Sequence, residues 1–315
     1  MSSSSNFVIC ISAVLPMFIL LCAGYVTRLT GIVTEELTEK LNSIVFKVTF
    51  PFMIFENIYG SDIGDVFSIR LIAFAFAAIA LEYIAGTVLT LKIEENQKSR
   101  GAMIQAIYRS NFVIMGLPIA MNIYGHGNVG VTAMMIALVV PVYNVLAVTT
   151  LEVYRNRKPE LKIILINIAK NPLIIGAVAA LLCVFFNIKL PGIVESAVSD
   201  IGGIATPAAL LILGASFKFS SVGRIKRNLT VICLLRLIII PAIVLTAAYL
   251  IGIRDIAFVT LIAIFAAPCA ISSYTMAQEM DSDGELAGAG VIFTSAFCSF
   301  TMFIILLAFK TIGAF

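Results

Sequence analysis

Long apolar stretches separated by short polar connections run the whole length of the chain. Each stretch holds about 20 residues or more, the length that an α-helix needs to cross the hydrocarbon core of a bilayer. The pattern therefore predicts ten transmembrane helices and no separate soluble domain. These helices are expected at residues 6–28, 38–59, 66–91, 101–124, 128–154, 162–187, 192–217, 228–251, 255–279 and 285–312.

Composition supports this class. Hydrophobic residues make up 60% of the 315 residues and charged residues 12%, and the mean hydropathy is +1.05. A soluble core of this size could not bury so much apolar surface. The net charge of +3 does not indicate a nucleic-acid partner, because the Lys and Arg residues lie in short connections and form no basic stripe. We expect an all-α polytopic membrane protein.

The basic residues are divided unevenly between the two sides of the predicted bundle. Connections that follow odd-numbered helices hold thirteen Lys and Arg residues, and those that follow even-numbered helices hold three. Cytoplasmic loops are enriched in positive charge. We therefore expect the odd-numbered connections in the cytoplasm and both termini outside, in a multi-pass protein of the cytoplasmic membrane.

Prolines recur at matching places in the two halves of the chain. Three prolines of the first half have partners 156, 156 and 150 positions later, again inside apolar stretches. The register indicates an internal repeat, although six prolines can also fall into register by chance. The pairs are Pro16 with Pro172, Pro51 with Pro207, and Pro118 with Pro268.

A hydrophilic seam at 155–161 divides the ten helices into two sets of five. It separates a first repeat, 1–154, from a second repeat, 162–315. Because five crossings is an odd number, the second repeat must enter the membrane in the opposite sense from the first. The halves would then form an inverted repeat, whose substrate site lies where the two copies meet.

The third proline pair predicts that the fourth and ninth helices are broken and cross near the middle of the membrane. Proline lacks an N–H group and clashes with the preceding turn, so Pro118 and Pro268 should each end one half-helix and start another. The free N–H groups at such a start favour an anion. Simple proline kinks are the alternative. The expected crossover and substrate-binding residues are Asn111, Gly116, Pro118, Asn122, Pro268, Ser272, Ser273 and Thr275.

Four charged residues lie inside predicted helices, where charge is costly and often functional. Each falls roughly 12–15 Å from the cytoplasmic end of its helix at helical rise. In one interpretation they form an anion-attracting vestibule, in which the acid pairs with a base and exchanges a proton. In the other, the basic side chains reach the headgroups and the acid only neutralises a neighbour. The four are Lys47, Glu82, Arg109 and Arg236.

Two polar residues after Pro268, Gln278 and Glu279, offer oxygen ligands for a coupling cation. The alternative is a solvated turn in the acidic run that ends at Glu285. No metal site, cofactor or enzyme activity is expected. His126 is the single histidine, which leaves no Ser-His-Asp triad and no HExxH site, and the sequence holds no GxxxxGK[ST] loop.

Short motifs occur in a characteristic order along nearly the whole chain. They are Leu41-Asn42-Ser43-Ile44-Val45-Phe46, Phe50-Pro51-Phe52, Ser110-Asn111-Phe112 and Gly116-Leu117-Pro118, Asn171-Pro172, Thr206-Pro207-Ala208, Arg236-Leu237 with Pro241, and Ala267-Pro268. In this order and spacing they resemble the bacterial branch of the auxin efflux carrier family of membrane transporters, which includes malate and malonate permease-like proteins. Lys47 departs from the apolar residues expected in that stretch.

The resemblance implies two inverted five-helix repeats, with helices 4 and 9 crossing at Pro118 and Pro268 and with Asn111 at the site. It also implies a secondary active transporter that moves a small organic anion, malate-like or auxin-like, by alternating access. An anion channel or uniporter that uses the same helix ends is the alternative. Besides the substrate, the lipid bilayer is an expected partner, while H⁺ or Na⁺ coupling and a homodimer stay open.

Overall fold

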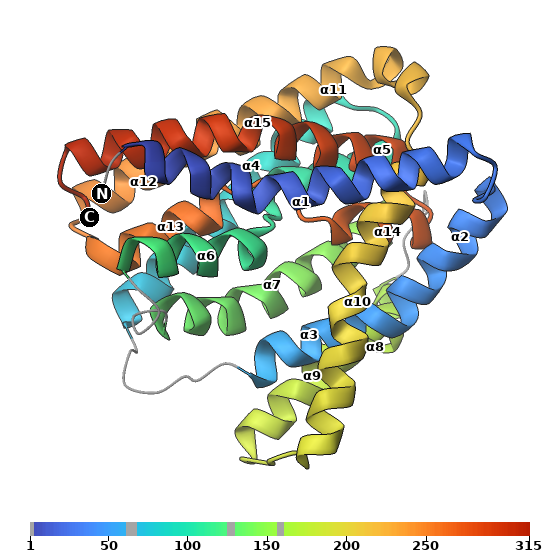
Figure 1. Cartoon of the computed structure of the whole chain (residues 1–315), viewed down its shortest axis with the longest axis horizontal. Helices are drawn as coiled ribbons and strands as arrows, with labels where there is room; N and C mark the ends of the chain where they lie inside the picture. The colour runs from blue at the N-terminus through green and yellow to red at the C-terminus, as the bar shows by residue number, and fades with distance from the viewer. Residues whose placement is uncertain (1–2, 61–67, 125–129, 156–160) are drawn as a thin grey trace.

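The computed structural model describes residues 3–60, 68–124, 130–155 and 161–315 (Figure 1). Within these ranges the regular structure is helical, apart from one antiparallel bridge between Ser110 and Cys269. The predicted all-α class is confirmed. The helices are α1 Ser3–Leu29, α2 Glu35–Ile44, η1 Val45–Thr49, α3 Phe50–Tyr59, α4 Ile69–Ile93, α5 Gln97–Tyr108, α6 Phe112–Tyr124, α7 Gly130–Arg155, α8 Leu161–Lys170, α9 Pro172–Phe185, α10 Gly192–Ser216, η3 Phe219–Ser221, α11 Val222–Leu234, η4 Leu235–Ile239, α12 Ile240–Leu250, α13 Asp255–Ala266, α14 Ser272–Glu279 and α15 Gly284–Thr311.

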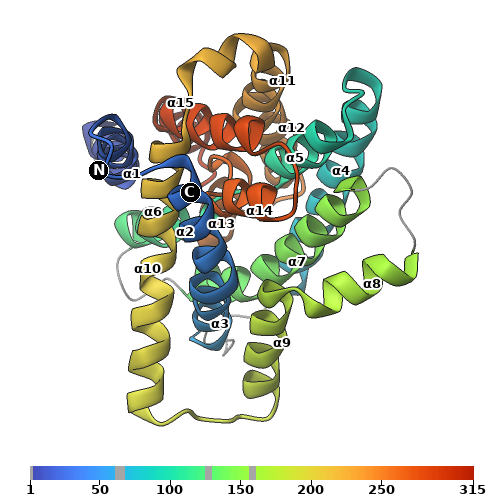
Figure 2. The same ribbon diagram turned by 90° about the vertical axis from the view of Figure 1, so that its right-hand side faces the viewer.

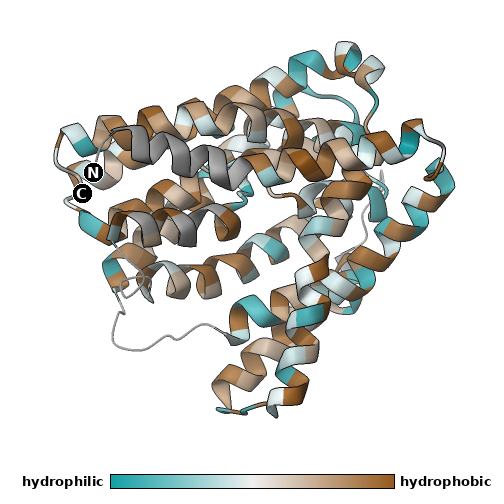
Figure 3. Cartoon of the chain, in the orientation of Figure 1, coloured by the Kyte–Doolittle hydropathy of each residue, from teal (hydrophilic) through white to brown (hydrophobic). Residues whose placement is uncertain are grey.

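Helical segments occupy each of the predicted ranges, but several are short or bent. By length and composition, five helices in the described ranges can cross a membrane, or six if α8 and α9, bent by 61°, form one span. Figure 3 shows hydrophobic residues along the helices and hydrophilic residues mainly at helix ends and in α2. The structure therefore fits a multi-pass membrane protein, and the count of ten crossings stays a prediction.

Asparagine side chains explain where two of these helices begin. Asn96 accepts a hydrogen bond from the backbone N–H of Lys98 at 2.9 Å, at the start of α5. Asn171 accepts one from the backbone N–H of Leu173 at 3.0 Å, at the start of α9. Pro172 is the first residue of α9, a position where the missing N–H costs nothing. The bend between α8 and α9 thus follows from the sequence Asn-Pro.

Two π-helical turns, η1 and η4, each precede a helix that has proline at its second position. These prolines are Pro51 in α3 and Pro241 in α12. A proline ring clashes with the carbonyl four residues earlier, and the wider π turn relieves that clash. Each π turn carries one basic residue, Lys47 in η1 and Arg236 in η4. The turns therefore set the direction of two charged side chains.

Helices α1 and α10 cross with their backbones in close contact. A Cβ atom added at Gly24 would overlap the carbonyl of Leu211, and one added at Gly214 would overlap the carbonyl of Leu21. Small residues allow such close approach between membrane helices. Helix α10 also contacts α3, and α3 in turn contacts α9 (Figure 2). These four helices pack together on one side of the crossover described below.

Replacing Gly214 with leucine is expected to destabilise the protein by about 1–3 kcal/mol or more, because no space exists for the side chain between α10 and α1. Gly203→Ala, in the same helix, is the matched control. A Cβ atom at Gly203 meets nothing within 4 Å, so this change should leave stability unchanged or raise it. Thermal unfolding in detergent measures both variants. Equal melting temperatures would contradict the α1–α10 crossing.

Candidate functional site

The two interrupted helices, α5–α6 and α13–α14, pair through their backbones at the interruptions. The N–H of Asn111 donates to the carbonyl of Pro268 at 2.8 Å, and the N–H of Ala270 donates to the carbonyl of Arg109 at 3.2 Å. Unwound backbone at membrane depth requires such partners. All four half-helices therefore meet at one place. The paired segments 109–111 and 267–271 are called the crossover.

The second interruption lies where the prolines predict it, and the first does not. Pro268 is in the unwound segment before α14, whereas Pro118 lies within α6, whose backbone is helical from Phe112 to Tyr124. The first interruption comes earlier because the backbone at Ser110 and Asn111 pairs with the second one. Asparagine is also a favoured residue directly before a helix. The prediction that Pro118 breaks the fourth helix is wrong.

Arg236 of η4 holds the carboxyl ends of both half-helices that lead into the crossover. Its Nη1 donates to the carbonyls of Ile107 and Tyr108 in α5, each at 3.1 Å. Its Nε and Nη2 donate to the carbonyls of Ala267 and Ile264 at 2.9 and 2.8 Å, at the end of α13. The last carbonyls of a helix lack intrahelical donors and carry partial negative charge. One guanidinium therefore neutralises two helix ends.

The same guanidinium pairs with Glu82 of α4. Nη1 lies 2.8 Å from Oε1 of Glu82, and the side chains are 0% and 1% exposed. Every nitrogen of Arg236 is thus hydrogen-bonded inside the protein, and none faces a solvent-accessible vestibule. Because its carbonyl and carboxylate partners come from several helices, Arg236 positions the crossover rather than a substrate.

A cavity of about 70 Å³ lies beside the crossover. Neutral polar side chains and one arginine line it together with apolar residues, and no acidic residue of the described ranges does. Elements far apart in the sequence supply the lining, among them α3, α7, α10 and the crossover itself. The polar lining residues are Asn57, Arg109, Ser110, Asn111, Tyr143, Asn144, Thr206 and Ser272.

Arg109 brings a buried positive charge to this cavity. Arg109 is 5% exposed; its Nη2 donates to Oδ1 of Asn144 at 2.6 Å, and its Nη1 lies 2.6 Å from Sδ of Met276. Both partners are neutral, and no carboxylate in the described part of the chain pairs with this guanidinium. A buried charge without a counter-ion is costly. The cavity is therefore a place where an anion would be stabilised.

Further hydrogen-bond donors surround the same space. The Nδ2 groups of Asn111 and Asn144 are buried and have no acceptor among the described residues. Helices α6 and α14 both begin here, since Val113 and Ser272 line the cavity. The positive dipole ends at these helix starts favour negative charge. A carboxylate, which only accepts hydrogen bonds when ionised, matches this set of donors.

Two of the predicted crossover residues, Ser273 and Thr275, do not line the cavity. Ser273 and Thr275 are buried in α14, where the carbonyl of Thr275 accepts a hydrogen bond from Nδ2 of Asn42 at 3.1 Å. Gly116 and Asn122 belong to α6, and their side-chain surroundings lie outside the described residues. Of the predicted set, the structure places Asn111 and Ser272 on the cavity and Pro268 in the paired backbone.

The four predicted intramembrane charges form three separate sets of contacts. Glu82 and Arg236 pair in the interior, and Arg109 lines the cavity. Lys47 is 57% exposed and lies 2.6 Å from Oε1 of Glu279 in α14. The shared vestibule is absent from the described residues because each basic group has different partners.

The two expected cation ligands, Gln278 and Glu279, have different contacts. The ammonium of Lys47 and the hydroxyl of Ser43 both contact Oε1 of Glu279, the hydroxyl at 3.2 Å. Gln278 lines a separate pocket of about 40 Å³, to which Glu279 does not contribute. Gln278 and Glu279 therefore have different surroundings, and Glu279 is paired with a lysine ammonium.

The Lys47–Glu279 ion pair connects η1 with α14. Removing either partner should therefore alter the equilibrium between conformations in which these two segments are in contact and conformations in which they are apart. We expect Lys47→Gln or Glu279→Gln to change the initial rate of substrate uptake by up to about fivefold, as for a partly exposed ion pair worth at most about 1 kcal/mol. The double variant should show no further change. Additive effects in this double-mutant cycle would mean that the two groups act independently.

Four lining residues, Tyr143, Asn144, Thr206 and Asn57, are not among those that the sequence predicts for the site. The predicted residues are mainly charged residues and residues near prolines. Asn144 nevertheless has a visible signal, because an amide stands inside the otherwise apolar stretch of the fifth predicted helix. A buried amide is costly unless it is hydrogen-bonded, so neutral amides inside membrane helices indicate sites much as charges do.

Comparison with known proteins identifies the family of this chain. The family model described as membrane transport protein matches residues 9–306. An uncharacterized transporter of Methanocaldococcus jannaschii is 24% identical over 299 residues, which cover 90% of this chain and 94% of that protein. An uncharacterized transporter of Methanothermobacter thermautotrophicus is 24% identical over 295 residues, covering 90% and 92%. This chain therefore belongs to the membrane transport protein family, which is the auxin efflux carrier family that its motifs resemble.

Proposed function

We propose that this protein is a secondary active transporter that carries a small organic anion, a mono- or dicarboxylate, by alternating access. The observation that carries the proposal is the buried guanidinium of Arg109, which lines the crossover cavity without a carboxylate partner in the described part of the chain. A substrate carboxylate would supply the missing counter-ion. It would also accept hydrogen bonds from the amides of Asn111 and Asn144. The positive dipole ends of α6 and α14 would favour its charge.

The size of the cavity bears on the substrate. About 70 Å³ accommodates a carboxylate group and little more, whereas sites for drug-sized ligands have about 300–1,000 Å³. We infer that the site widens during transport to admit the whole substrate. A cavity this small also favours a carrier over a continuous anion-conducting pore.

Contacts between helices support the inverted repeat. Helix α1 lies against α10 and α9 lies against α3, where a Cβ atom at Gly176 would come within 2.6 Å of the carbonyl oxygen of Pro51. The first and second predicted helices contain α1 and α3, and the sixth and seventh contain α9 and α10. If the first corresponds to the sixth and the second to the seventh, the α1–α10 contact and the α9–α3 contact are images of each other. If the fourth and fifth predicted helices likewise correspond to the ninth and tenth, the contacts of α5 and α6 with α7 match those of α13 and α14 with α15. We therefore retain 1–154 and 162–315 as the two repeats; most of the seam lies outside the described residues.

The predicted orientation is part of the proposal. The start of α1 and the end of α15 lie at the same end of the molecule (Figure 1), as an even number of crossings requires. With thirteen basic residues in the odd-numbered connections, that end would face outside the cell. Alternating access would then move the crossover cavity between the two sides by motion of one helix group against the other.

Two measurements on purified protein test the proposal. Small mono- and dicarboxylates should raise the unfolding temperature, and repeating the screen with and without Na⁺ and across pH would identify the coupling ion. In liposomes, unlabelled substrate trapped inside should accelerate uptake of labelled substrate. A channel or pore would show no such acceleration, and a silent stability screen would remove the carboxylate assignment.

A further inference from the structure

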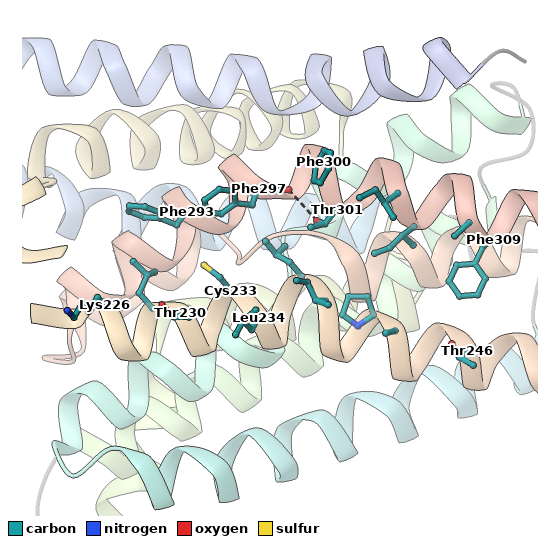
Figure 4. Close-up of a pocket in the computed structure, with 18 of the residues that line it drawn as sticks. Lys226, Thr230, Cys233, Leu234, Thr246, Phe293, Phe297, Phe300, Thr301 and Phe309 are labelled. Atoms are coloured by element: carbon teal, nitrogen blue, oxygen red, sulfur yellow. Dashed lines mark hydrogen bonds between the residues drawn. The ribbon is translucent and has the colours of Figure 1, made fainter. Parts of the chain in front are cut away.

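A long apolar groove runs along the outside of the protein, away from the crossover cavity. Helices α11, η4 and α12 form one wall and α15 forms the other, and the space between them measures about 840 Å³ (Figure 4). Large apolar side chains in the groove are exposed, with Leu234 at 45%, Phe297 at 53% and Phe300 at 64%. Exposed apolar surface of this extent in a membrane protein is expected to contact hydrocarbon chains.

The groove is charged at one end. Figure 4 shows Lys226 at that end and Thr246 and Phe309 toward the other. Twenty residues of helix separate Lys226 from Thr246, which corresponds to ~30 Å, about the thickness of the hydrocarbon core. Lys226 therefore lies near one membrane surface, and the apolar lining continues from it toward the opposite surface.

Lys226 differs from the other bases of α11 in its partners. Arg224 lies 2.5 Å from Glu285, and Arg227 lies 3.7 Å from Glu94. Lys226 is exposed and makes no ion pair or hydrogen bond to any residue in the described ranges. Thr230, one helical turn later, lines the same groove and offers a hydroxyl group. An ammonium and a hydroxyl at the end of an apolar groove match the headgroup and acyl chain of an anionic phospholipid.

We propose that this groove binds one anionic phospholipid, with its phosphate at Lys226 and Thr230 and an acyl chain along Leu234, Leu237 and Phe297. Basic side chains beside membrane helices on the cytoplasmic side attract anionic lipids, and Lys226 belongs to the base-rich connections assigned to that side. The lipid would also contact η4 from behind, since Leu237 of η4 lines the groove while the neighbouring Arg236 holds the crossover. Bound lipid would therefore stabilise the turn that positions the transport site.

The chain contains no tryptophan, so a single introduced tryptophan reports on its own surroundings. Phe297→Trp places the fluorophore in the groove, and Leu81→Trp places it on the exposed face of α4, where Leu81 is 68% exposed. Both variants are reconstituted with brominated phosphatidylglycerol or brominated phosphatidylcholine, whose acyl chains quench tryptophan. Comparing headgroups at each position cancels differences in depth.

At Phe297→Trp, the anionic lipid should be preferred about fivefold, the effect of about 1 kcal/mol from one lysine near the surface. Adding Lys226→Gln should remove that preference, whereas the matched change Lys92→Gln at the exposed end of α4 should not. At Leu81→Trp the two lipids should quench equally. The melting temperature of each variant in detergent confirms that it is folded.

Three outcomes would overturn the proposal. The first is equal quenching by both lipids at Phe297→Trp. The second is an anionic preference that survives Lys226→Gln. The third is a tryptophan shielded from both lipids together with oxidative cross-linking of two chains through Ala242→Cys in the groove, which would identify the groove as an interface between copies. The transport proposal stands or falls separately, because none of these measurements uses a substrate.

Discussion

Arg109→Gln is expected to weaken carboxylate binding strongly while leaving the protein folded. The guanidinium contributes the positive charge of the crossover cavity, and its described partners, Asn144 and Met276, are neutral. Charge-assisted hydrogen bonds are worth about 1.5–3 kcal/mol, so affinity should fall by roughly 10–100-fold or more. Removing an uncompensated buried charge should cost little stability. Substrate-dependent thermal shift and uptake in liposomes measure both effects.

Asn144→Asp tests the role of Arg109 by placing a carboxylate beside its guanidinium. The new carboxylate would stand where Oδ1 of Asn144 already accepts from Arg109, and it would act as a built-in counter-ion. We expect substrate binding to be lost while the unfolding temperature without substrate is maintained or raised. Arg70→Gln, a change at an exposed arginine of α4, is the control and should transport normally. Normal transport by Asn144→Asp would show that Arg109 is not the anion-binding group.

Arg236→Met should instead destabilise the whole fold, by about 3–5 kcal/mol, because it leaves Glu82 as an unpaired buried charge. It also removes the donors to the final carbonyls of α5 and α13. We expect poor expression and a much lower unfolding temperature, with a similar loss whether or not substrate is present. A detergent stability series across these variants is the measurement.

A double variant separates the contribution of the Arg236–Glu82 ion pair from that of the carbonyl contacts. Changing both partners, Arg236→Met with Glu82→Leu, removes the unpaired carboxylate and should recover part of the lost stability. Recovery should be incomplete, because the helix-end carbonyls still lack donors. Full recovery would mean that the ion pair alone matters and that the carbonyl contacts contribute nothing. An unchanged unfolding temperature for Arg236→Met alone would contradict the proposed positioning role.

The helix pattern of this protein was largely readable from its sequence. Apolar stretches of membrane length gave ranges that match the helices, because burial of backbone groups in lipid allows few alternatives to a helix. The two π turns were not predicted, although Pro51 and Pro241 are visible, since several local rearrangements can accommodate a proline. The first interruption was misplaced at Pro118 because the cause of the true one is a long-range backbone pairing with Pro268.

The candidate site was predictable only in part. Arg109, Asn111 and Ser272 stand out as polar residues near the expected interruptions, and all three line the cavity. Their partners Asn144 and Thr206 come from helices whose position relative to the crossover no local pattern encodes. The roles of Arg109 and Arg236 were equally hidden, because both are arginines inside apolar stretches. Their different partners alone distinguish a group that could meet an anion from one that holds helix ends.

The pairing of Glu82 with Arg236 also bears on how such a protein could arise by duplication. The two residues are 154 positions apart, close to the spacing of the matched prolines, so under the proposed repeat they stand at nearly equivalent places in the two halves. A dimer of identical first halves would bring two acids together, and a dimer of identical second halves two bases. Under the proposed repeat, the two halves would therefore be obligate complements, each unable to replace the other.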